Sequence, residues 1–157
     1  MATRDLHHNI TVVDTILPAL RTSDAGTVKG AAVNATGYES VEHVVTLGVS
    51  ADVLSDALYY NLVLQDSPDS TDGNFVNVTN PDYVLGPTVD DNGVFAQIVL
   101  AGDSNHYRIG YLGPQPFTRV NVVAVGNHSS GTPYSAQAIL GNPHGSPGDT
   151  SGTLVNT

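Results

Sequence analysis

The sequence predicts an all-β protein, a single-domain β-sandwich or jelly-roll-like barrel of about 8–9 short strands with extended N- and C-terminal arms. Short segments rich in β-branched residues recur along the chain, separated by Gly, Pro, Asn and Asp, and no helical periodicity runs across them. The length of 157 residues suits one domain. We therefore expect an N-terminal arm at residues 1–8, a sandwich domain at residues 9–141 and a flexible C-terminal tail at residues 142–157.

The first half of the domain contains four candidate strands. Residues 9–17 are rich in β-branched side chains and end at Pro18, which predicts the first strand. Residues 27–35 predict a weaker second strand, and residues 40–49 predict a stronger third one. Along residues 58–65, Leu58, Tyr60, Leu62 and Leu64 lie on one side, which is the period of a strand with one buried face. The polar stretch that follows, up to residue 74, is expected to be a loop.

The second half begins with two short pieces, residues 75–78 and 83–85, on either side of Pro81. Because proline cannot donate to a central ladder, these pieces are expected at a sheet edge. The sequence DDNG at residues 90–93 is the strongest turn signal, since Asn-Gly readily takes positive φ. Further strands are expected at residues 94–100 and 133–140.

Residues 105–127 are predicted to be the centre of the domain. The first half of this stretch alternates as a half-buried strand does, and the second half carries apolar side chains on both faces. The sequence GPQP at residues 113–116 must turn the chain between them, so two adjacent antiparallel strands are expected. The side chains expected in the core include Leu62, Val45, Ile98, Ile109 and Val122.

The composition excludes several classes of partner. The sequence contains five Lys and Arg residues and fifteen Asp and Glu residues, which gives a formal charge of −10. Binding to nucleic acid depends on Lys and Arg displacing counterions, so we expect no nucleic-acid partner and no anionic membrane partner. There is no cysteine for a disulfide or a Cys-based zinc site. No apolar run reaches the roughly 20 residues of a membrane span, and residues 1–8 lack the apolar core of a signal peptide, so we expect no Sec export.

Two groups of residues are weak candidates for metal or proton chemistry. Asp66, Asp69 and Asp72 concentrate the hard oxygen ligands that calcium prefers, but their spacing is not that of an EF-hand, so a solvated turn is favoured over a metal site. His43 lies on an otherwise apolar strand face, which favours a neutral, hydrogen-bonded core or interface histidine over a ligand or catalytic base. No cofactor is expected.

Catalysis has no positive support in the sequence. There is no Gly-x-Ser-x-Gly elbow and no Gly-rich phosphate loop, so we do not expect an enzyme. The tyrosines could include a platform for stacking on sugars, because a tyrosine combines an apolar ring with a polar tip. Core or subunit-contact roles are favoured for most of them, namely Tyr59, Tyr60, Tyr107, Tyr111 and Tyr134.

Several segments nevertheless resemble a known group of proteins. They are residues 4–10 (RDLHHNI), 12–13 (VV), 16–19 (ILPA), 107–113 (YRIGYLG), 119–122 (RVNV) and 138–143 (AILGNP). The group consists of small structural proteins encoded in the head-gene regions of tailed bacteriophages and prophages. The similarity is spread over most of the chain.

The resemblance implies a virion protein, in particular a capsid decoration (cement) protein that is made in the host cytoplasm and binds the capsid exterior. Its partners would be the major capsid protein and further copies of itself, as a dimer or trimer on the capsid lattice. Within the resembling N-terminal arm, Arg4, Asp5 and Leu6 supply a charge pair and an apolar anchor, so they are the candidates for capsid or subunit contact. The alternative is a β-sandwich recognition module, a tail or head-fibre component that binds host surface glycans.

Overall fold

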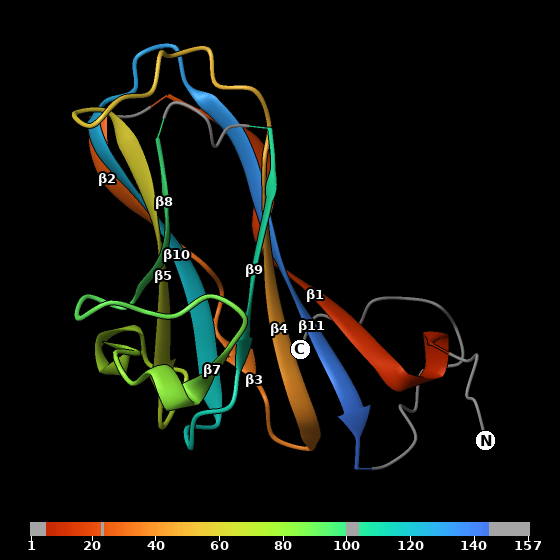
Figure 1. Ribbon diagram of the computed structural model, residues 1–157. Coiled ribbons are helices and arrows are strands. Elements are labelled where there is room, and N and C mark those ends of the chain that lie inside the picture. Colours follow the sequence, from red (N-terminus) through yellow and green to blue (C-terminus); the bar gives the residue numbers. More distant parts are fainter. Residues whose placement is uncertain (1–5, 23, 100–103, 145–157) are drawn as a thin grey trace.

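Two antiparallel sheets make up the fold (Figure 1). The computed structural model describes residues 6–22, 24–99 and 104–144, and these residues contain eleven strands. The expected all-β sandwich is confirmed, with more strands than the sequence predicted. The described strands do not close into a barrel.

The first sheet has five strands, in the order β1 (Ile10–Arg21), β11 (Thr132–Pro143), β4 (Tyr38–Leu47), β9 (His106–Tyr111) and β7 (Val84–Leu85). The second sheet has six: β2 (Asp24–Lys29), β10 (Phe117–Asn127), β5 (Tyr59–Ser67) and β6 (Val76–Asn77) in that order, with β3 (Val33–Asn34) on β10 and β8 (Val94–Ile98) on β5. Three single turns of 3-10 helix are η1 (His7–Asn9), η2 (Asp72–Asn74) and η3 (Pro81–Tyr83). No helix in the described part of the chain is long and apolar enough to cross a membrane.

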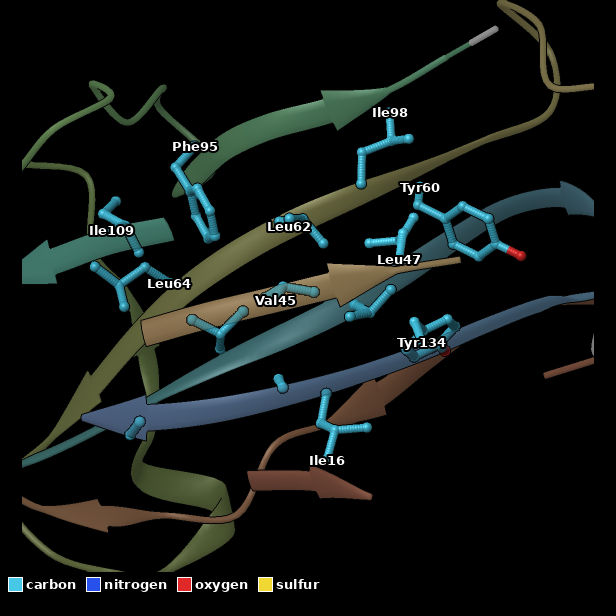
Figure 2. Packing of buried hydrophobic residues seen from close by; sticks show 14 of the residues in the cluster. Ile16, Val45, Leu47, Tyr60, Leu62, Leu64, Phe95, Ile98, Ile109 and Tyr134 are labelled. Carbon is cyan, nitrogen blue, oxygen red and sulfur yellow. The ribbon is translucent and has the colours of Figure 1, made fainter. Parts of the chain in front are cut away.

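The core lies between the inner faces of the two sheets (Figure 2). Alternation along each strand sends every second side chain into this layer, and the strands β4, β5, β10 and β11 together supply most of it. The five side chains that the sequence placed in the core, Leu62, Val45, Ile98, Ile109 and Val122, are each 0 % exposed. That prediction is confirmed.

The expected pairing of the two strands within residues 105–127 is wrong. Strand β9 pairs with β4 and β7 in the first sheet, whereas β10 pairs with β5 and β2 in the second sheet. The proline-containing connection between them therefore crosses from one sheet to the other. Its backbone is fixed to the end of β9, because the Gln115 amide donates to the Tyr111 hydroxyl at 3.1 Å. A turn signal shows that the chain reverses, but it does not say whether the next strand stays in the same sheet.

Strand β1 is longer than predicted, because it continues through Pro18 to Arg21. It is the edge of the first sheet, where a proline without an N–H is tolerated. Register shifts occur between Asp14 and Ile16 and between Ile16 and Ala19. The strand thus bulges twice in its second half and keeps its pairing with β11 up to Arg21.

Residues 30–31 join the edges of the two sheets. The Gly30 amide donates to the Val120 carbonyl oxygen of β10 at 3.1 Å, and the next amide, of Ala31, donates to the Thr15 carbonyl oxygen of β1 at 2.9 Å. A Cβ atom at Gly30 would clash with the Val120 carbonyl oxygen, so glycine is required for this close approach. One side of the sandwich is therefore held closed at the level of Thr15.

His43 is a core residue of β4, as the sequence favoured. It is 1 % exposed, and its Nε2 lies 3.3 Å from the hydroxyl of Thr118 on β10. That hydroxyl donates to the Gln65 carbonyl oxygen of β5, so the Nε2 of His43 is the donor in the His43–Thr118 bond. The chain of hydrogen bonds links the two sheets across the core. Burial lowers the pKa of His43 to about 4, so the ring is neutral at neutral pH.

Candidate functional site

Exposed apolar side chains gather where β1 ends. Leu17 is 67 % exposed and Leu20 is 60 % exposed. Their neighbours Ile16 and Ala19 pair with inward-facing residues of β11, so alternation directs both leucines to the outer face of the first sheet. Leu20 pairs with the exposed Pro133, whose carbonyl accepts from the amide of Gly48 at 2.8 Å. We define the apolar patch as Leu17, Leu20 and Pro133.

The loop that carries Val49 is fixed in place. Its Asp52 carboxylate accepts hydrogen bonds from the backbone amides of Ser130 at 3.0 Å and Gly131 at 2.7 Å. Desolvation acts to raise the pKa of Asp52, but these amide hydrogen bonds outweigh it and hold the pKa below its usual value. Ala51 adds a backbone hydrogen bond to the Gly131 carbonyl oxygen. The loop that follows Gly48 is therefore fixed to residues 130–131, next to Pro133.

Of the predicted contact residues of the arm, the structure describes Leu6, which lies at the other end of β1. Arg4 and Asp5 fall outside the described residues, whereas Leu6 immediately precedes η1 and is 67 % exposed. Leu17 lies seven residues after Ile10, so at roughly 3.3 Å per residue the start of β1, next to Leu6, is about 20 Å from the patch. The structure thus adds a second exposed apolar surface, which sequence reasoning missed because the face of these leucines depends on the register shifts in β1.

The three aspartates that were weak metal candidates have separate partners. Asp66 is not in a loop: it is buried in β5 and accepts a hydrogen bond from the Tyr111 hydroxyl at 2.6 Å. Asp69 accepts from the amide of Thr71 and the side chain of Asn74. Asp72 lies in η2 and forms ion pairs with Lys29 and Arg119. Among the described residues, no group of three or more His, Asp or Glu side chains is placed to hold a metal ion.

The side chains of Lys29 and Arg119 belong to a polar network on the outer face of the second sheet. The sequence did not predict this network. Arg119 of β10 is 5 % exposed, and its guanidinium donates to Gln65 at 2.9 Å and to Asp72 at 2.5 Å. The guanidinium also lies 4.0 Å from the ring centre of Phe75. Lys29 pairs with the other oxygen of Asp72 at 2.6 Å, and hydrogen bonds from Lys29 and Arg119 lower the pKa of Asp72. The network holds the loop around η2 against the sheet, which is a structural role.

Replacing Arg119 with methionine should lower the free energy of unfolding by about 1.5 kcal/mol, because a buried, charge-assisted set of hydrogen bonds is lost while the apolar stem is kept. Lys29→Met is the matched control, since it removes an exposed cation from the same carboxylate and should cost no more than about 0.5 kcal/mol. Urea unfolding of both variants measures the difference. Equal losses would contradict the distinction between the buried and the exposed cation.

Most of the tyrosines considered for sugar stacking are buried in the core. Tyr60, Tyr111 and Tyr134 are at most 5 % exposed and belong to the core cluster. The Tyr111 hydroxyl connects β9 to Asp66 of β5, and desolvation together with this hydrogen bond raises the pKa of Tyr111. Tyr59 and Tyr107 are half-buried. The favoured role of most of these tyrosines, in the core, is therefore confirmed.

These observations define the protein as a two-sheet β-sandwich with an exposed apolar patch at one end of an edge strand. No protein-family model matches the sequence, and no curated protein matches it. Among solved structures, it is similar to the SPBc2 prophage-derived protein YomS, with 13% sequence identity and a TM-score of 0.42 over 84% of this chain and 92% of that chain. It is also similar to a structure of infectious bursal disease virus Gx strain, with 11% identity and a TM-score of 0.21 over 90% of this chain and 38% of that chain.

Proposed function

We propose that this chain is a non-enzymatic virion structural protein that binds the outer surface of an assembled phage capsid and stabilises it by bridging neighbouring capsid subunits. The observation that carries the proposal is the apolar patch. Its side chains contribute little to the core, and contiguous apolar surface that a fold leaves exposed is typical of an interaction site. The patch includes Leu17, which also lies in a segment that resembles phage head proteins, residues 16–19.

Burial of the patch would supply part of the free energy of a specific contact. Full burial of a leucine side chain is worth roughly 1.5–3 kcal/mol, and Leu17 and Leu20 each have more than half of that surface still to bury. A protein that binds the assembled shell better than the free subunits stabilises the shell by that difference in affinity. The charge of −10 favours a capsid surface with basic groups around an apolar socket.

Capsid binding tests the proposal directly. Purified protein is mixed with emptied, expanded capsids and sedimented, and the bound fraction is measured against concentration. The double variant L17S/L20S should weaken binding at least tenfold, about 1.4 kcal/mol, while its melting temperature stays close to that of the wild type. The matched control is L85S/L112S, which removes two leucines that are 55% and 50% exposed and lie away from the patch; it should bind as the wild type does.

Deleting residues 2–8 in the same assay separates the two candidate contacts, since this change removes Arg4, Asp5 and Leu6 and leaves the patch intact. If the deletion abolishes capsid binding and L17S/L20S does not, the capsid contact lies in the arm rather than in the patch. Failure of the wild type to sediment with capsids, combined with binding on a glycan array, would overturn the proposal in favour of the recognition module.

A further inference from the structure

The first half of β1 has half-exposed side chains on both of its faces. Val13 pairs with the buried Ala138, so alternation places Thr11 and Val13 on the inner face and Ile10 and Val12 on the outer face. All four are only half-buried. In Figure 1 this part of β1 extends away from the second sheet, which leaves the inner face partly uncovered as well.

The two halves of this edge strand differ in how they are protected. The second half contains Pro18 and two register shifts. At its start, the Thr15 carbonyl oxygen already accepts a hydrogen bond from the Ala31 amide. Bulges, prolines and covering loops are the devices that stop an edge strand from pairing with another chain. Within residues 6–22, 24–99 and 104–144, nothing gives residues 10–14 any of these devices, and they pair with β11 on one side only. The opposite edge of the same sheet, β7, is only two residues long.

We propose that residues 10–14 form the interface of a homodimer, in which a second copy adds its own β1 antiparallel to the first, about a two-fold axis near Val12. The five-stranded sheets of the two copies then become one continuous sheet. The inference concerns the protein alone and does not depend on capsid binding.

Self-complementarity favours a second copy as the occupant. A two-fold axis at Val12 sets Thr11 opposite Val13 and Ile10 opposite Asp14, so inner-face residues meet inner-face residues and outer-face residues meet outer-face residues. Asp14 is the single charged residue in this stretch. The axis places the two Asp14 residues at opposite ends of the paired segment, about 13 Å apart along the strand. This distance exceeds the roughly 8–10 Å over which charges interact at physiological salt. The pairing thus avoids the like-charge contacts that a molecule of charge −10 would make through most other surfaces.

The geometry gives a charge-swap test, because the two Val12 side chains lie directly opposite each other. Sedimentation velocity from about 1 μM to about 1 mM should show a concentration-dependent dimer of the wild type. V12K and V12E should each be monomeric at concentrations where the wild type dimerises, since like charges opposite each other are destabilising. An equimolar mixture of V12K and V12E should restore a dimer. The matched control L85K adds a lysine at the opposite edge and should leave the dimer unchanged.

A second measurement uses the wild type alone and so does not depend on the variants folding. Hydrogen exchange of residues 10–14 should slow as the concentration rises through the dimerisation range. A wild type that stays monomeric throughout that range, or that forms a trimer, would overturn the proposal. So would a dimer that V12K leaves intact, or an edge whose exchange is equally slow at every concentration, because a segment of the same chain would then cover it.

Discussion

Replacing Ile109 with alanine should lower the free energy of unfolding by about 2–4 kcal/mol. Ile109 is 0 % exposed and pairs with His43 of the neighbouring strand. Figure 2 shows its side chain near Leu64 and Phe95, which come from the second sheet. The cavity would be lined by residues of both sheets, so it could not be filled by a small movement of one strand.

Urea unfolding monitored by circular dichroism measures this loss. Leu112→Ala is a suitable control, since Leu112 lies three residues further along and is 50% exposed. The control should change the free energy of unfolding by less than about 0.5 kcal/mol. A similarly small change at Ile109 would contradict the position of the core.

Acidification should destabilise the protein through His43 by about 2.5 kcal/mol between about pH 7.5 and about pH 4.5. The pKa of this histidine is about 4 in the folded state, against an ordinary value of 6.5, because burial disfavours the charged ring. The unfolded chain therefore binds a proton at His43 below about pH 6.5, whereas the folded chain does so only near pH 4. The contribution is fully present above pH 6.5 and is lost as the pH falls toward 4.

The change can be assigned to His43 with the variant His43→Gln, whose amide can still donate to Thr118 but does not titrate in this range. The variant should be less stable than the wild type at neutral pH and should lose about 2.5 kcal/mol less between the two pH values. His144→Gln is the matched control, because His144 is exposed; it should retain the pH dependence of the wild type. If His43→Gln retained it too, the titration of His43 would not be its source.

Strands with local alternation were predictable from the sequence. The alternation of residues 58–65 and 40–49 identified β5 and β4 within two residues of their observed ends. The turn at residues 90–93 was also predicted, and Gly93 there has a φ of 73°, with its amide bonded to the Asp90 carbonyl oxygen. These features depend on side chains that are close together in the sequence.

The remaining features depend on residues that are far apart in the sequence. Asp66 was assigned to a loop because its partner Tyr111 could not be known, and its burial in a strand requires that partner. The separation of β9 and β10 into different sheets is set by sheet order. Leu17 and Leu20 have the composition of core residues, and only the register of β1 with β11 shows that they face outward. The contacts predicted for Arg4, Asp5 and Leu6 remain predictions.

The position of β11 between β1 and β4 determines when the first sheet can form. On the ribosome, β1 and β4 are both synthesised long before β11, the strand that lies between them. Ile10 therefore cannot pair until Gly141 has been synthesised. Folding of this sheet is therefore expected to follow synthesis rather than accompany it, on the millisecond-to-second scale of sandwiches dominated by non-local pairing. During that interval, the unpaired edges of β1 and β4 expose the nascent protein to aggregation.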